Sequence, residues 1–222
     1  MGDLLVSALV VIVTAVIVAA IFIISGKKKK EKEAGILQLA QRNGWTFEKV
    51  NQPQMAGFIL RTAEWTLEAL VSSSERTSEA GSSPVSFKNK WSTNRVTSQE
   101  GLVMIGPKVP QVQLGGFGEM VLQKALRMML GDEANQAVGL GEVKVGRSSF
   151  GDRYSVWATS QEAAEKVLTF ELENALLKWN GKELPVLKFS ATGTQISTHQ
   201  ARLDNVEGVQ ALVDLGKAVL GG

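Results

Sequence analysis

The sequence predicts an α+β fold: one N-terminal transmembrane helix, residues 4–25, followed by a cytoplasmic domain of antiparallel sheet with helices packed on one side. Three observations predict it. An uncharged apolar stretch lies near the N-terminus, and apolar and polar residues alternate at period two from Trp65 to Val71 within a β-rich half, residues 45–110. Apolar stripes at helical spacing are mixed with short strands in residues 111–222.

The predicted span, Leu4 to Ser25, has 22 residues without a charge, and 15 of them are Leu, Ile, Val or Phe. As a helix it would be about 33 Å long, against roughly 30 Å of bilayer hydrocarbon. A cleaved signal peptide is the alternative, but that needs a basic first segment and a shorter apolar one. Because the tail Met1 to Asp3 has no Lys or Arg, we expect a retained span.

A basic cluster directly follows the span: Lys27, Lys28, Lys29, Lys30 and Lys32. By the positive-inside rule, this side faces the cytoplasm of a bacterial inner membrane, and tail 1–3 faces outward. The same lysines would attract anionic membrane lipids. Residues 26–44 are predicted to be a juxtamembrane stalk, with a short helix over Ile36 to Arg42 that ends at Asn43 and Gly44.

Net charge and composition exclude several classes of function. Of the formal charge of +2, Asp3 contributes −1 and residues 27–33 contribute +3, so the domain after them is neutral. Nucleic-acid binders carry a basic face, so we expect no nucleic-acid partner. The chain has no Cys, which excludes disulfides, thiolate nucleophiles and Cys-ligated metal. We expect no metal and no cofactor.

Residues 45–110 are predicted to be an antiparallel, β-rich half. Strands are expected from Trp45, over Phe58 to Val71, over Val85 to Thr97 and over Leu102 to Ile105, the last closed by Gly106 and Pro107. Ser72 to Pro84 contains no large apolar residue and is predicted to be a loop. The strands on either side of it should therefore form a long-looped hairpin.

Residues 111–222 are predicted to follow the order helix, then β-β-α-β-β-α. A helix is expected over Phe117 to Leu130, and strands over Val138 to Val145 and Tyr154 to Ala158. Thr159 and Glu162 fit a capping box that begins one helix ending at Asn180. A hairpin of Val186 to Ser190 with Thr194 to Thr198, turned at Gly193, precedes a last helix capped by Asn205.

Two stretches of this second half carry a resemblance. The segment Phe150 to Thr159, the Ala-rich helix after it, and the hairpin Leu187 to Ser197 resemble the C-terminal part of a bacterial family of membrane-anchored domains of unknown function. The resemblance covers about the last third of the chain. It implies an anchored cytoplasmic domain, and no catalytic residue is carried over from it.

Candidate chemical groups are few. His199, the single histidine, lies at a predicted strand end, and one His without Cys does not build an ordinary zinc site. Gly139 to Gly146 is glycine-rich but lacks the spacing of a phosphate-binding loop, so turns are expected. The carboxylate pairs Glu171 with Glu173 and Asp132 with Glu133 are expected to be solvated.

Binding surfaces are suggested by residue type alone. Ala8, Ala15 and Ala19 share one face of the predicted span, which either packs against another helix or reflects the ordinary abundance of Ala. Trp45 is a candidate membrane-interface aromatic, whereas Trp65, Trp91, Trp157 and Trp179 are expected in the core. Met104, Met120, Met128 and Met129 suit either a binding face or the core.

These observations lead to three functional hypotheses. The first is a non-catalytic accessory or scaffold subunit that stabilises a larger membrane complex, respiratory or photosynthetic in type, with lipids and other subunits as partners. It predicts an exposed apolar patch near the membrane. The second is an anchored ligand-binding or sensing domain, which predicts an apolar pocket with convergent polar groups. The third, a hydrolase, requires a group of shifted pKa in a cleft. We expect no enzyme.

Overall fold

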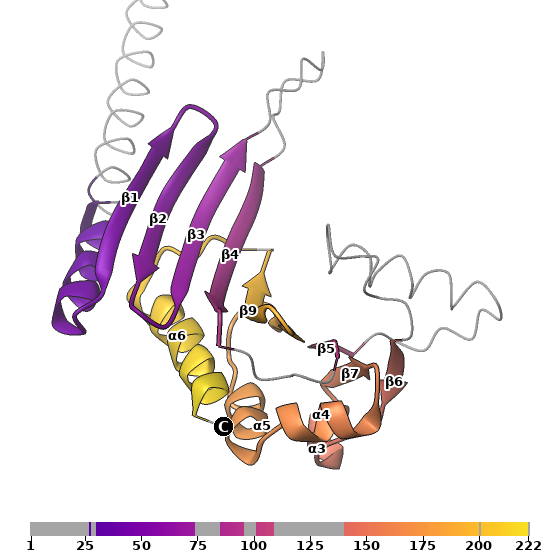
Figure 1. Ribbon diagram of the computed structural model, residues 1–222. Helices are drawn as coiled ribbons and strands as arrows, with labels where there is room; N and C mark the ends of the chain where they lie inside the picture. The colour runs from indigo at the N-terminus through magenta and orange to yellow at the C-terminus, as the bar shows by residue number, and fades with distance from the viewer. Residues whose placement is uncertain are drawn as a thin grey trace, which may run out of the picture.

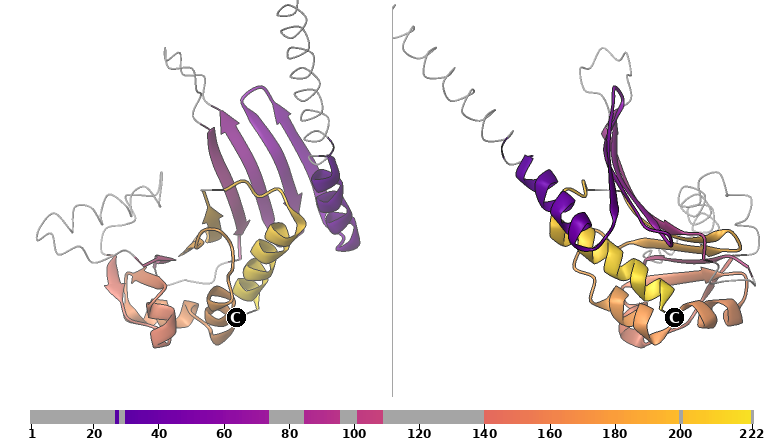
Figure 2. Two further views of the ribbon diagram at one scale, coloured as in Figure 1. Left: turned by 180° about the vertical axis from the view of Figure 1, so that it is seen from behind. Right: turned by 60° about the vertical axis from the view of Figure 1, so that its left-hand side comes forward.

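The computed structural model describes residues 27, 30–73, 85–95, 101–108, 140–199 and 201–221. They form an α+β domain with one antiparallel sheet of nine strands, in the order β1-β2-β3-β4-β9-β8-β5-β7-β6. The sheet is strongly curved, and the helices lie on one side of it (Figures 1 and 2). This confirms the predicted fold class for the domain. The span predicted over residues 4–25 lies outside the described residues, and no helix within them is long and apolar enough to cross a membrane.

The domain begins with a helix at residues 30–42. Its end has the hydrogen bonds of a Schellman motif: the Trp45 amide donates to the Ala40 carbonyl, and the Gly44 amide to that of Gln41. Gly44 has a φ of +69°, which favours glycine there. The predicted stop at Asn43 and Gly44 is confirmed. Ile36 and Ala40 are buried in the core, so the segment predicted as a stalk packs against the sheet.

The first four strands are sequential hairpins: β1 (Thr46–Gln52), β2 (Met55–Arg61), β3 (Thr66–Ser73) and β4 (Val85–Thr93). The single strand predicted over Phe58 to Val71 is wrong, because the chain turns at residues 62–65 and continues as β3. The Thr62 hydroxyl accepts the amide hydrogens of Glu64 and Trp65 at this turn. Such side-chain bonds favour turns over strands. The predicted β3–β4 hairpin is confirmed by its pairing.

The remaining strands are β5 (Val103–Pro107), β6 (Gly141–Val143), β7 (Tyr154–Ala158), β8 (Val186–Ser190) and β9 (Gly193–Thr198). β5 was expected to complete the first half, but it pairs with β7 and β8 instead. β4 pairs with β9. The two predicted halves therefore share one sheet, and one apolar cluster contains residues of both.

Four further helices cover one face: α3 (Ser148–Gly151), α4 (Gln161–Val167), α5 (Phe170–Leu177) and α6 (Val206–Leu220). The single helix predicted after Thr159 is wrong. Ser160, not Thr159, caps α4, and Thr169 caps a separate α5. Asn205 caps α6 as predicted, and Val209, Leu212 and Val213 are buried.

Candidate functional site

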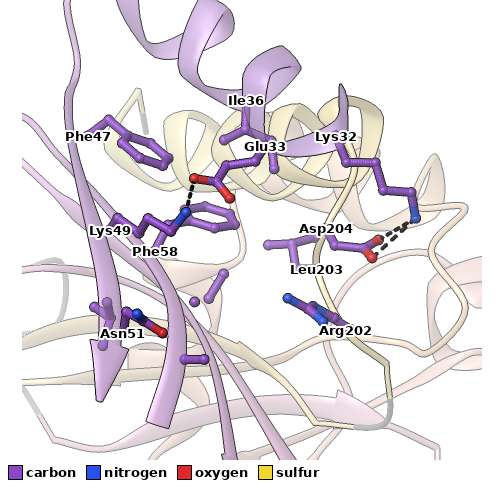
Figure 3. A pocket seen from close by; sticks show the side chains of 14 residues that line it. Lys32, Glu33, Ile36, Phe47, Lys49, Asn51, Phe58, Arg202, Leu203 and Asp204 are labelled. Carbon is purple, nitrogen blue, oxygen red and sulfur yellow. Dashed lines mark hydrogen bonds and ion pairs between the residues drawn. The ribbon is translucent and has the colours of Figure 1, made fainter. Parts of the chain in front are cut away.

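The cavity site is a hollow of about 390 Å³ between three parts of the chain: helix 30–42, the strands β1 to β3, and the segment 202–204 that precedes α6 (Figure 3). This volume lies within the range of about 300 to 1,000 Å³ that is typical of small-molecule pockets. A second hollow, about 430 Å³, is lined by the loop ends at residues 62–66 and 92–95 and has a mostly polar lining.

The floor of the cavity site is apolar. Ile36, Phe58 and Ala69 line it with 2%, 8% and 4% of their surface exposed. Phe58 pairs across the strands with Ala69 on one side and Lys49 on the other. The ring of Phe47 stacks on that of Phe58, with 5.9 Å between centroids. An apolar ligand surface would therefore be removed from water here, at a gain of about 25 cal/mol per Å².

Small residues leave the space open. Ala56, Gly57 and Ala69 contribute almost no side-chain volume at the point where β2 and β3 form the cavity wall. Gly57 has a φ of +154°, and a Cβ at this position would lie 2.0 Å from the carbonyl oxygen of Ala69. Only glycine fits such a close approach of two strands.

Two ion pairs hold the rim. Lys49 of β1 pairs with Glu33 of the helix, and the Lys32 ammonium lies 3.1 Å from the Asp204 carboxylate. These pairs join the helix to β1 and to the segment before α6. They are largely exposed, so each stabilises the fold by about 1 kcal/mol or less.

Two polar side chains of the lining, both exposed to solvent, have no partner among the described residues. In the described part of the chain, Arg202 and Asn51 form no hydrogen bond and no ion pair, whereas the other four charged residues of the lining are paired. Figure 3 shows the ends of Arg202 and Asn51 pointing toward each other across the hollow. The site can therefore hold a molecule with an apolar body and an anionic group, and Arg202 can neutralise that group.

The structure describes four of the predicted binding residues: Lys27, Lys30, Lys32 and Trp45. Ala8, Ala15, Ala19, Lys28 and Lys29 lie outside the described residues. Lys27 and Lys30 are exposed, and Lys32 alone reaches the cavity site. Trp45 is half-buried, packs edge to face on Trp65 at 5.2 Å, and lies under the Lys217 ammonium.

Three of the four tryptophans that were expected in the core, and Met104, occupy buried positions. Trp65, Trp91 and Trp157 are buried, as expected, and Trp179 is half-buried. Met104 is 1% exposed and pairs with Trp157 across β5 and β7. The core interpretation of Met104 is confirmed, whereas Met120, Met128 and Met129 lie outside the described residues.

The candidate chemical groups have structural explanations. His199 is exposed directly after β9, as expected, and its amide donates to the carboxylate of Glu183. Gly146 lies at a bend with a φ of +81°, Gly141–Val143 form strand β6, and Gly139 lies outside the described residues. The expectation that Glu173 is solvated is wrong. It is 6% exposed and accepts hydrogen bonds from the amide and the Nε of Arg147.

Tyr154 is a buried group with a shifted pKa, and it lies away from the cavity site. Burial raises the pKa of Tyr154 to about 12, against a smaller lowering by Arg153. Its hydroxyl donates to the Leu176 carbonyl, away from the cavity site. Within the described ranges, no three His, Asp or Glu residues are grouped as metal ligands would be. Asp132 and Glu133 are not among these residues.

Sequence reasoning missed the cavity site. Lys32 and Asp204 are 172 positions apart, and no local motif connects them. The signal that was present is indirect: Arg202 and Asp204 precede a well-capped helix, and Phe47, Lys49 and Asn51 alternate along β1 on one face.

Comparison with known proteins adds no assignment. No protein-family model, curated protein or solved structure matches this chain. The resemblance of the last third to membrane-anchored domains of unknown function therefore stays a hypothesis.

Proposed function

We propose that this chain is a membrane-anchored binding domain that holds a small molecule in the cavity site at the cytoplasmic face. One observation carries the proposal: a hollow of about 390 Å³ combines a buried apolar floor with two polar side chains, Arg202 and Asn51, that have no partner among the described residues. Convergent polar groups around an apolar pocket are typical of ligand sites.

The position of Arg202 is explained better by ligand binding than by a contribution to the stability of the fold. Among the described residues, the exposed Arg202 has no hydrogen bond or ion pair that explains its position at the rim, since both carboxylates of the lining are paired with lysines. A cation without a partner beside an apolar surface adds little to folding. It adds specificity when an anion is bound.

The accessory-subunit hypothesis remains a prediction. It expects an exposed apolar patch, and the large exposed apolar side chains of the described part are Leu37, Val85 and Phe170. They lie on three different elements: helix 30–42, β4 and α5. The geometry therefore favours the binding domain.

The proposal is tested by filling the cavity site. Ala56→Phe places a ring in the hollow, whereas Ala34→Phe makes the same change at an exposed position of helix 30–42. The full chain and both variants would be extracted from native membranes with a detergent-free polymer, and the retained small molecules identified by mass spectrometry.

We expect a small molecule that is retained by the parent chain and by Ala34→Phe but absent from Ala56→Phe. Identical profiles for all three proteins, with Ala56→Phe folded by circular dichroism, would refute the proposal. The same extraction tests the accessory hypothesis, which predicts a co-extracted protein complex that is lost when Ala15 and Ala19 are changed to Leu.

A further inference from the structure

We infer that the ligand of the cavity site is an amphiphilic anion: a molecule with one carboxylate or phosphate group on an alkyl chain. Arg202 would bind the anionic group, and the floor of Ile36, Phe58 and Ala69 would hold the chain. This inference rests on the proposed function, because it names the ligand class of the same site.

Charge is the first argument. The lining contains three cations and two carboxylates. Lys49 with Glu33, and Lys32 with Asp204, form neutral pairs. The guanidinium of Arg202 is the remaining charge, so the lining carries one positive charge that a monoanion would neutralise. Arg202 is exposed to solvent, so an anion bound over the floor could pair with it, whereas a cationic ligand would be repelled.

The chemistry of the polar groups is the second argument. Arg presents a planar fork of N–H donors that matches the two oxygens of a carboxylate or phosphate. The Asn51 side chain lies opposite with its amide oxygen toward Arg202, as Figure 3 shows, and rotation of the amide by 180° would present an N–H donor to the same group. Neither side chain must break an existing bond to do so.

The separation of polar and apolar lining is the third argument. The buried lining residues are Ile36, Val50, Phe58 and Ala69, and none of them has a polar side chain. The charged side chains of the lining come from the helix, β1 and the segment 202–204, and form its rim. A sugar or nucleotide base placed on this floor would lose hydrogen bonds to water without replacement. An alkyl chain would lose none.

The same chemistry has two sources, a soluble fatty acid and an anionic membrane lipid. Helix 30–42 follows the predicted span within a few residues, so either source could reach the rim. Both have an anionic group and an alkyl chain, and the experiment separates them.

The test measures binding of radiolabelled decanoate and decanol to the full chain in phosphatidylcholine nanodiscs, with empty nanodiscs as the blank. The variants are Arg202→Gln and, as a control with the same charge change, Arg42→Gln at an exposed position with no partner in the described residues. Ala56→Phe blocks the hollow.

We expect saturable decanoate binding that weakens about tenfold in Arg202→Gln, corresponding to loss of one charge-assisted pair. Arg42→Gln should bind as the parent does, and Ala56→Phe should not bind. Competition by phosphatidylglycerol added to the nanodisc would identify a membrane lipid as the source. Decanoate binding unchanged by that lipid would identify a soluble amphiphile.

Two other outcomes are separable. Decanol that binds as well as decanoate, with no effect of Arg202→Gln, would overturn the anionic ligand class and leave the binding domain in place. If neither probe shows saturable binding, the proposed ligand class is overturned. The proposed function is refuted by a different result: in the extraction experiment, Ala56→Phe would retain the same small molecules as the parent chain.

Discussion

At the residue scale, one close contact in the core joins Trp91 of β4 to Gly216 of α6. Trp91 is fully buried, and a Cβ on Gly216 would lie 2.2 Å from Cε2 of its indole. Glycine in a helix interior costs about 1 kcal/mol relative to alanine. Glycine is needed at position 216 because any side chain there would prevent α6 from packing this closely against the sheet.

We predict that Gly216→Ala lowers the free energy of unfolding by about 1 to 3 kcal/mol, because overpacking outweighs the gain in helix propensity. Urea unfolding followed by tryptophan fluorescence measures it. Gly151→Ala, where a Cβ meets nothing within 4 Å, is the control and should be neutral or slightly stabilising. A Gly216→Ala variant as stable as the parent would show that α6 shifts freely.

Tyr154 gives a pH dependence at the same scale. Its side chain is 2% exposed, and burial raises its pKa from 10.0 to about 12. Below pH 10 both states hold the proton, so stability is unaffected. As the pH rises from 10 to 12 the unfolded chain loses the proton first, so folding loses about 2 to 3 kcal/mol.

Because the chain has one tyrosine, tyrosinate absorbance reports this group alone. We predict a midpoint near pH 12 in the folded protein and near 10 in urea. Tyr154→Phe should remove the corresponding part of the alkaline loss of stability. A folded-state midpoint near 10 would contradict the prediction.

At the element scale, the break between α4 and α5 shows what local patterns can and cannot predict. An apolar stripe runs from Ala164 through Leu172 without interruption in the sequence, which predicts one helix. In the structure Leu168 has a φ of −81° and a ψ of 74°, and the Thr169 hydroxyl caps α5 by accepting from the Leu172 amide. The helix therefore breaks where Thr169 caps α5, although the apolar stripe continues across this point.

The caps can be tested directly. We predict that Ser160→Ala lowers the free energy of unfolding by about 1 kcal/mol, because its hydroxyl accepts the Ala163 amide. Thr159→Ala, one position earlier and exposed, should change it by less than about 0.5 kcal/mol. Urea unfolding compares the two. The opposite ranking would restore the capping box that the sequence predicts from Thr159.

At the scale of the whole molecule, the sequence predicts the positions of strands and helices better than it predicts which strands pair. The strand over Tyr154 to Ala158 and the hairpin at Gly193 follow from short apolar runs and turn residues, which are local. The pairing of Asn89 with Thr198 joins strands about a hundred residues apart, and the cavity site likewise joins Lys32 to Asp204. No local periodicity encodes such contacts, so neither the sheet order nor the site was predictable.

The β4–β9 pairing should make the domain one cooperative unit. Ile196 is fully buried and lies between Trp91 of β4 and Leu187 of β8. We predict that Ile196→Ala lowers the free energy of unfolding by about 2 to 5 kcal/mol. The same variant should lower hydrogen-exchange protection on both sides of the β4–β9 pair, in β2 and β3 as much as in β7 and β8, because the two sides share one core. Ser197→Ala, next to it and half-buried, is the control. Protection lost on one side of the β4–β9 pair alone would show two units that unfold separately.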